Sequence, residues 1–177
     1  MSHGVAHERV SQADMNRKSG RPDQTETDGS AAEAQGLSLG PLGELLGFHI
    51  ARATVTTMAL FEQHVGEPLG LRKVEYSMLL LLLANGPLAP KRLALALALS
   101  APSLTQLLDR MQERALLRRE RSQVDRRSQN VVLTDLGSEL ARAGVAAAAP
   151  MARALDQRLS RAEHAMLIEL LRKVAGD

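Results

Sequence analysis

The sequence predicts a mainly α-helical protein that carries one small β-hairpin. Apolar residues make up 45% of its 177 residues and aromatic residues only 2%, so the core must be built from Leu, Ala, Val and Met. Leu and Ala are strong helix formers, whereas strands favour the aromatic and β-branched types. Within several segments the apolar residues recur at helical spacing, and capping residues or Gly and Pro terminators mark where these segments begin and end. These observations argue against an all-β sandwich or barrel.

The chain divides into a polar N-terminal tail and one folded region. Residues 1–36 show no apolar period, and we expect a disordered tail because they cannot bury enough surface to offset their ordering entropy. Residues 41–176 have the length of a single domain. The longest apolar runs have seven residues, whereas a membrane span needs about 20. With no cysteine and no signal pattern, we expect a cytoplasmic protein that has no disulfide and no membrane partner.

Two helices are expected first. One covers about residues 41–65, with Pro41 in its first turn, and should be broken by Gly66, Pro68 and Gly70. The next covers about residues 73–84 and should stop at the terminator of residues 85–87. Since this second helix is nearly all apolar, we expect it to be largely buried.

A third and a fourth helix follow closely. The segment RLALALALS alternates like a strand, but its Leu and Ala residues favour a short helix. Ser100 is a good N-cap for the next helix, and Pro102 is tolerated in the first turn. The spacing i, i+3, i+4, i+7 predicts that this helix buries Leu104, Leu107, Leu108 and Met111.

A hairpin and two helices complete the predicted order. Residues 116–121 and 130–134 are expected to pair across a basic tip. Thr134 should cap a long helix over residues 135–158, which Pro150 should kink. Ser160 with Glu163 is a capping box, so it predicts a last helix that ends at about residue 175.

Positive charge is concentrated in one segment. Residues 91–127 hold nine basic and four acidic side chains, a net charge of +5, whereas the rest of the chain carries −3. Such a density of Arg is typical of a surface that binds phosphates. A solvated helix face with i,i+4 ion pairs, as Asp109–Glu113 beside Arg110–Arg114 would allow, is the alternative.

The helices over about residues 90–113 form a helix–turn–helix, and the second is the right width for the DNA major groove. The hairpin over about residues 117–134 follows it like a wing. The residues in common with known regulators are Leu93, Leu99, Ser100, Leu104, Thr105, Leu107, Leu108, Asp109, Arg110 and Met111, then Asp125, Arg126, Arg127, Leu133, Thr134 and Gly137. The last six keep the spacing DRRxxxxxLTxxG. On these residues the sequence resembles the MarR family of winged helix–turn–helix transcriptional regulators.

The resemblance implies a helical dimerisation region made by the N- and C-terminal helices. A second copy of the chain would then cover the apolar faces of two segments, at about residues 41–65 and 135–175. A monomeric core that uses both ends internally is the alternative. Two positions depart from the family: Ala98 replaces the usual turn Gly, and Gln106 stands where relatives often carry Arg.

The resemblance and the helix pattern together assign DNA-binding residues. On the second helix of the helix–turn–helix these are Ser100, Ala101, Pro102, Ser103, Thr105, Gln106 and Arg110, and on the wing they are Arg126 and Arg127. Asp125 is expected to shape the wing, because phosphate repels a carboxylate. For Arg127, a solvated turn residue paired with Asp125 is the alternative.

A small-molecule effector is implied by the resemblance alone. The segment LGFHIARA looks most like members that respond to aromatic acids or their thioesters, and His49 with Arg52 would face the effector. Ordinary surface residues are the alternative for both. The chain has no Cys and no HxxxH or HExxH spacing, so we expect no metal and no cofactor.

The expected function is a DNA-binding transcriptional regulator, most simply a repressor. It would act as a homodimer on a pseudo-palindromic operator and be released by the effector. The alternatives are a low-specificity architectural DNA-binding protein and a small helical enzyme. No catalytic residue is assigned, because the chain lacks a phosphate loop, a GxSxG elbow and clustered carboxylates.

Overall fold

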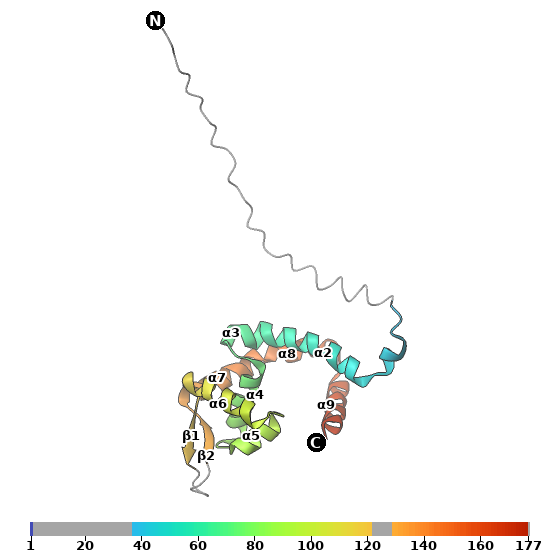
Figure 1. Cartoon of the computed structure of the whole chain (residues 1–177). Coiled ribbons are helices and arrows are strands. Elements are labelled where there is room, and N and C mark those ends of the chain that lie inside the picture. The colour runs from blue at the N-terminus through green and yellow to red at the C-terminus, as the bar shows by residue number, and fades with distance from the viewer. Residues whose placement is uncertain (2–36, 122–128, 177) are drawn as a thin grey trace. The chain divides into compact units, whose positions relative to one another are not determined.

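The computed structural model describes residues 1, 37–121 and 129–176 (Figure 1). The remainder of the expected N-terminal tail and the tip of the expected wing therefore lie outside the described residues. The chain forms two compact units, Met1–Leu45 and Leu46–Asp177. The first unit contains the short 3₁₀ helix η1 (Gly40–Glu44), and the second contains every other described element.

The predicted fold class, mainly α with a small hairpin, is confirmed. Within the described ranges the only sheet has two strands, and helices make up most of the rest (Figure 1). No helix in the described part of the chain is both long enough and apolar enough to cross a membrane.

The first expected helix differs from the prediction at both ends. Leu45 is extended, so η1 is separate and the α-helix α2 is Leu46–Phe61. The chain then stays helical through a π turn, η2 (Glu62–Gly66), and through α3 (Glu67–Leu69). The expectation that Gly66 and Pro68 break the helix is therefore wrong. The wider π turn comes just before Pro68, whose ring would otherwise clash with the carbonyl four residues earlier.

The next three helices follow the predictions. α4 is Lys73–Asn85, and none of its Leu or Met side chains is exposed. α5 (Pro90–Ala96) is the short helix predicted for the alternating segment, and α6 (Ala101–Glu113) begins at the predicted N-cap. The turn between them places Ala98 at φ +51°, and Ala115 after α6 is at φ +53°. A left-handed Ala costs about 1–2 kcal/mol, so this chain tolerates strain where glycine is usual.

The hairpin consists of β1 (Leu117–Arg121) and β2 (Gln129–Leu133), which pair antiparallel with Leu117 opposite Leu133. Sequence reasoning missed a third participant, Leu88, just before α5. The Leu88 N–H donates to the Val131 carbonyl at 3.1 Å, and the Val131 N–H donates back at 2.8 Å. The start of the helix–turn–helix is thus bonded directly to the hairpin.

The C-terminal helices keep the predicted caps. Thr134 caps α7 (Asp135–Ala147), and the helix is interrupted at Ala148 before α8 (Ala149–Asp156), near the predicted kink at Pro150. The capping box predicted for Ser160 opens α9 (Arg161–Ala175).

One apolar core joins α4, α5, α6, the hairpin and α7. The predicted buried stripe of α6 is confirmed: Leu104, Leu107, Leu108 and Met111 are all at most 3% exposed. Against this stripe pack residues from the neighbouring elements, among them Met78, Leu79, Leu82, Leu93, Leu117, Val131 and Ala141.

The junction between the hairpin and α7 explains part of the sequence motif. The Gly137 N–H donates to Thr134 Oγ1 at 3.0 Å, and Thr134 Oγ1 donates to the Ala115 carbonyl at 2.6 Å. A Cβ on Gly137 would run into the backbone carbonyl of Leu116. Glycine is therefore required here by the close approach of α7 to the chain that leaves α6.

Gly137→Ala is expected to lower the free energy of unfolding by about 1–3 kcal/mol, because the backbone must shift to accept the methyl group. Gly47→Ala is the matched control. The Cβ added at Gly47 would meet no atom within 4 Å, so alanine in α2 should leave stability unchanged or raise it slightly. Urea unfolding followed by circular dichroism measures both, and equal stability of the two variants would contradict the close approach.

Candidate nucleic-acid interface

The N-terminal end of α6 is exposed and polar. The Ser103 N–H donates to Ser100 Oγ at 3.3 Å, and the two hydroxyl oxygens lie 2.8 Å apart. Ala101, Pro102 and Ser103 are all exposed. An exposed helix N-terminus with its hydroxyl groups suits a phosphate of the DNA backbone, because its amides and dipole favour negative charge.

The exposed face of α6 continues beyond this end. Thr105 and Gln106 are exposed and lie off the buried leucine stripe. Thr105 Oγ1 donates to the Ala101 carbonyl at 3.0 Å, so its methyl group and an oxygen lone pair remain for outside contacts. A glutamine on such a face can make a bidentate hydrogen bond to the edge of adenine.

Arg110 is placed differently from these residues. Its side chain is half-buried, and it lines a cavity between α6 and the start of α4. The structure therefore groups Arg110 with Arg72 and Glu75, and not with the exposed Ser100 to Gln106 end of the helix.

The basic segment is partly neutralised by ion pairs between elements. Asp109 Oδ1 lies 2.6 Å from Arg119 Nη2, which ties α6 to β1, and Arg118 pairs with Glu120 at 2.7 Å within the strand. The i,i+4 ion pairs along α6, which the alternative interpretation of this charge would need, are not among the ion pairs found within the described ranges. Among the described basic side chains of this segment, Lys91, Arg92, Arg110 and Arg121 have no ion pair with a described carboxylate.

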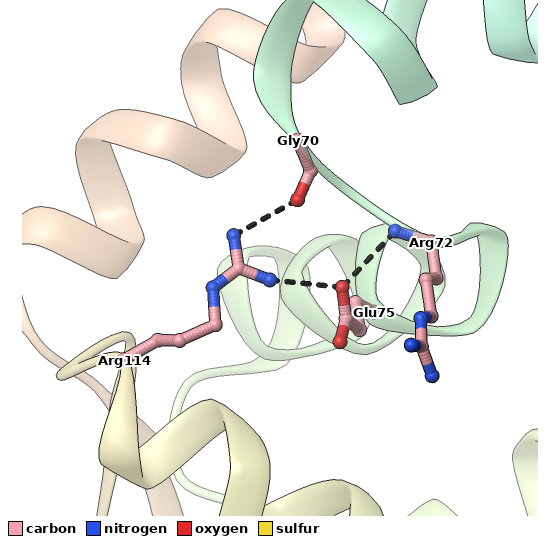
Figure 2. A network of polar contacts seen from close by, with 4 residues as sticks. All are labelled: Gly70, Arg72, Glu75 and Arg114. Atoms are coloured by element: carbon pink, nitrogen blue, oxygen red, sulfur yellow. Dashed lines mark hydrogen bonds and ion pairs between the residues drawn. The ribbon is translucent and has the colours of Figure 1, made fainter.

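A polar network holds the other end of α6 (Figure 2). Arg114 Nη1 lies 3.0 Å from Glu75 Oε2, and Arg114 Nη2 donates to the Gly70 carbonyl at 2.9 Å. The Glu75 carboxylate is only 4% exposed and also accepts the Arg72 N–H at 3.0 Å. Sequence reasoning missed this network, because Glu75 and Arg114 stand 39 positions apart and no local pattern links them.

The wing residues of the prediction cannot be placed. Asp125, Arg126 and Arg127 lie outside the described residues, although both strands that carry them are described.

The residues expected to contact an effector lie on α2. His49 and Arg52 are both exposed, and the Arg52 guanidinium carbon is 5.7 Å from the centre of the Phe48 ring. The rings of Phe48 and His49 meet edge to face at 5.6 Å. The cavity beside Arg110 does not include either residue. Within the described residues, no group of three or more His, Cys, Asp or Glu side chains could hold a metal ion.

Comparison with known proteins bears directly on this surface. The model of the MarR family matches residues 69–128, which cover α4, α5, α6 and β1. The chain is 35% identical to the transcriptional repressor CouR in a structure bound to a 23-mer DNA duplex, with a TM-score of 0.70, covering 78% of this chain and 98% of that one. A structure of CouR bound to p-coumaroyl-CoA gives 31% identity and a TM-score of 0.68, covering 78% of this chain and 97% of that one.

A curated relative agrees with these structures. The chain is 29% identical over 130 residues to an uncharacterized HTH-type transcriptional regulator, YhbI of Bacillus subtilis, covering 73% of this chain and 82% of the relative. The residues that the family model matches, 69–128, include the buried stripe and the exposed polar end of α6. The chain belongs to the MarR family and is a DNA-binding transcriptional regulator with a winged helix–turn–helix.

Proposed function

We propose that the protein is a homodimeric repressor that binds a pseudo-palindromic operator and releases it when a small-molecule effector binds. The exposed polar end of α6, with Gln106 beside it, carries the DNA-reading part of this proposal. Ser100 and Ser103 would bind phosphate, Gln106 would read a base edge, and Arg126 and Arg127 would bind the backbone from the wing. The DNA-bound CouR relative supports this arrangement.

The unpartnered apolar face of α9 supports the homodimer. Met166, Leu167, Ile168, Leu170, Leu171 and Val174 are each between 40% and 60% exposed, and no residue of α9 is buried. A fifteen-residue helix with such a face is stable in water when another surface covers it. Several apolar residues of α2, namely Leu46, Ile50 and Val55, are exposed as well. A second copy of the chain would cover both faces.

The effector proposed is an aromatic acid or its thioester. Its support is the relative CouR, which is bound to p-coumaroyl-CoA in one structure, together with the helix that carries His49 and Arg52. The Arg52 guanidinium would pair with the anionic group, and the Phe48 ring beside it would contact the aromatic part.

Gln106→Ala is expected to relax the preference for one base in each half-site, because a bidentate contact to adenine contributes about 1–3 kcal/mol of discrimination. The salt dependence of DNA binding by the Gln106→Ala variant should stay nearly unchanged. Arg127→Ala should instead weaken binding to all sequences and reduce the slope of log K against log salt by about 0.9 for each lost phosphate contact. The operator is first selected from a random duplex pool, and binding is titrated at several salt concentrations.

Two outcomes would contradict the DNA-binding proposal. If Gln106→Ala changes the salt slope but not the base preference, a different face of α6 enters the groove. If bulk non-specific DNA competes as well as the selected duplex, the protein is an architectural DNA-binding protein, since a regulator binds its operator about 10³–10⁷ times more tightly.

The double variant Leu167→Glu with Leu171→Glu is expected to convert the dimer to a monomer, because two charges would be buried in the proposed interface. Leu95→Glu is the control, since Leu95 is 84% exposed on α5 and lies outside both proposed dimerisation regions. Light scattering coupled to gel filtration measures the mass of each variant. A monomeric wild type, or a double variant that remains dimeric, would contradict the homodimer.

Arg52→Ala is expected to weaken binding of an aromatic acid or thioester at least tenfold, because the anionic group loses its guanidinium partner. Calorimetry of benzoate, p-coumarate and p-coumaroyl-CoA against both proteins measures the difference. Equal affinities in wild type and variant would remove Arg52 from the effector site.

A further inference from the structure

A cavity of about 510 Å³ lies in the corner between the chain after η2, the start of α4 and the second half of α6. It belongs to neither the exposed end of α6 nor the helix that carries His49 and Arg52. Its volume falls within the range of small-molecule sites. The charged residues in its lining are Arg72, Glu75, Arg110, Glu113 and Arg114, and Leu71 is the one sizeable apolar side chain among the lining residues.

The charges around this cavity do not balance. Arg114 and Glu75 neutralise each other through their 3.0 Å ion pair, and the second carboxylate contact of Glu75 is the Arg72 N–H (Figure 2). The Arg72 guanidinium points away from this carboxylate in the same view. The other charged lining residues are Arg72, Arg110 and Glu113, and no ion pair within the described ranges includes any of these three. One positive charge is left over.

The side chain of Arg110, on the α6 side of this cavity, carries an unpaired hydrogen-bond donor. Its Nε atom is buried and has no hydrogen-bond partner among the described residues. An unpaired buried donor of a charged group is unfavourable, so such atoms in native proteins call for a physical explanation. Arg110 also lines the cavity, and the two terminal Nη groups of a guanidinium form a planar fork that matches a carboxylate.

We propose that this cavity binds a small aliphatic carboxylate, held in bidentate fashion by Arg110, with Arg72 as the second cation. The class of ligand follows from the lining: the fork selects a planar oxyanion, and the scarcity of apolar side chains disfavours an aromatic body. A dicarboxylate of four or five carbons has one carboxylate for each of the two remaining guanidinium groups, those of Arg72 and Arg110. The site is separate from the effector site proposed on α2 and does not depend on it.

The test compares the binding of succinate with the binding of succinamide, which is the neutral diamide of succinate. The readout is the ¹⁵N Nε–H resonances of arginine in the full-length protein, with the Arg110 signal assigned by its loss in Arg110→Lys. Succinate is expected to shift the Arg110 Nε–H signal saturably, whereas succinamide should not. Arg110→Lys keeps the charge but removes the fork, and it should weaken succinate binding at least tenfold in calorimetry.

Arg142→Lys is the matched control, since Arg142 is exposed on α7 and lies outside the cavity. It should bind succinate as the wild type does, and a circular dichroism melt verifies that both variants fold. Equal succinate binding by Arg110→Lys and the wild type would overturn the proposal, and so would equal binding of succinate and succinamide. If succinate does not bind and Arg110→Ala instead lowers the salt slope of DNA binding, Arg110 contacts a DNA phosphate and the carboxylate site is wrong. None of these outcomes changes the expectation that the wild type binds DNA sequence-specifically, so failure of the carboxylate site is distinguishable from failure of the proposed function.

Discussion

The burial of one face of α6 fixes which of its residues reach solvent. Four large apolar side chains at helical spacing lie in the core, each contributing about 1.5–3 kcal/mol when fully buried. A helix held this way cannot rotate about its axis without exposing them. Ser103 and Gln106 are therefore presented at a fixed orientation, and the DNA-reading surface is a consequence of the core.

Contacts outside the core hold the helix at its middle and at its C-terminal end, and they position the hairpin beside it. Arg119 ties β1 to Asp109 in the middle of α6, while Arg114 ties the end of α6 to the start of α4 through Glu75. Leu88 bonds the entry of α5 to β2. Arg114 and Arg119 raise the local positive charge of the sequence, but in the structure carboxylates of neighbouring elements neutralise them. The electrostatic attraction for DNA must come from the other basic residues of the segment, and it falls as salt rises.

The sequence predicted what depends on local chemistry. The cap at Ser100, the buried stripe of α6 and the capping box at Ser160 each need only residues within a few positions, so their spacing reveals them. The course of the first helix was mispredicted, because a π turn at residues 62–66 relieves the constraint that Pro68 imposes in a regular helix. The Glu75–Arg114 pair and the cavity beside it could not be predicted, since they join segments brought together only by the packed core.

The most direct test of the account measures whether DNA covers the exposed face of α6. The natural chain has no cysteine, so a single one introduced by Gln106→Cys or by Ala143→Cys on the exposed side of α7 can be labelled selectively. The rate of reaction with a thiol reagent is measured with and without a saturating amount of the selected duplex. We predict that DNA slows labelling at position 106 at least tenfold and leaves position 143 unchanged. Equal labelling rates at position 106 with and without DNA would contradict the claim that this face of α6 enters the groove.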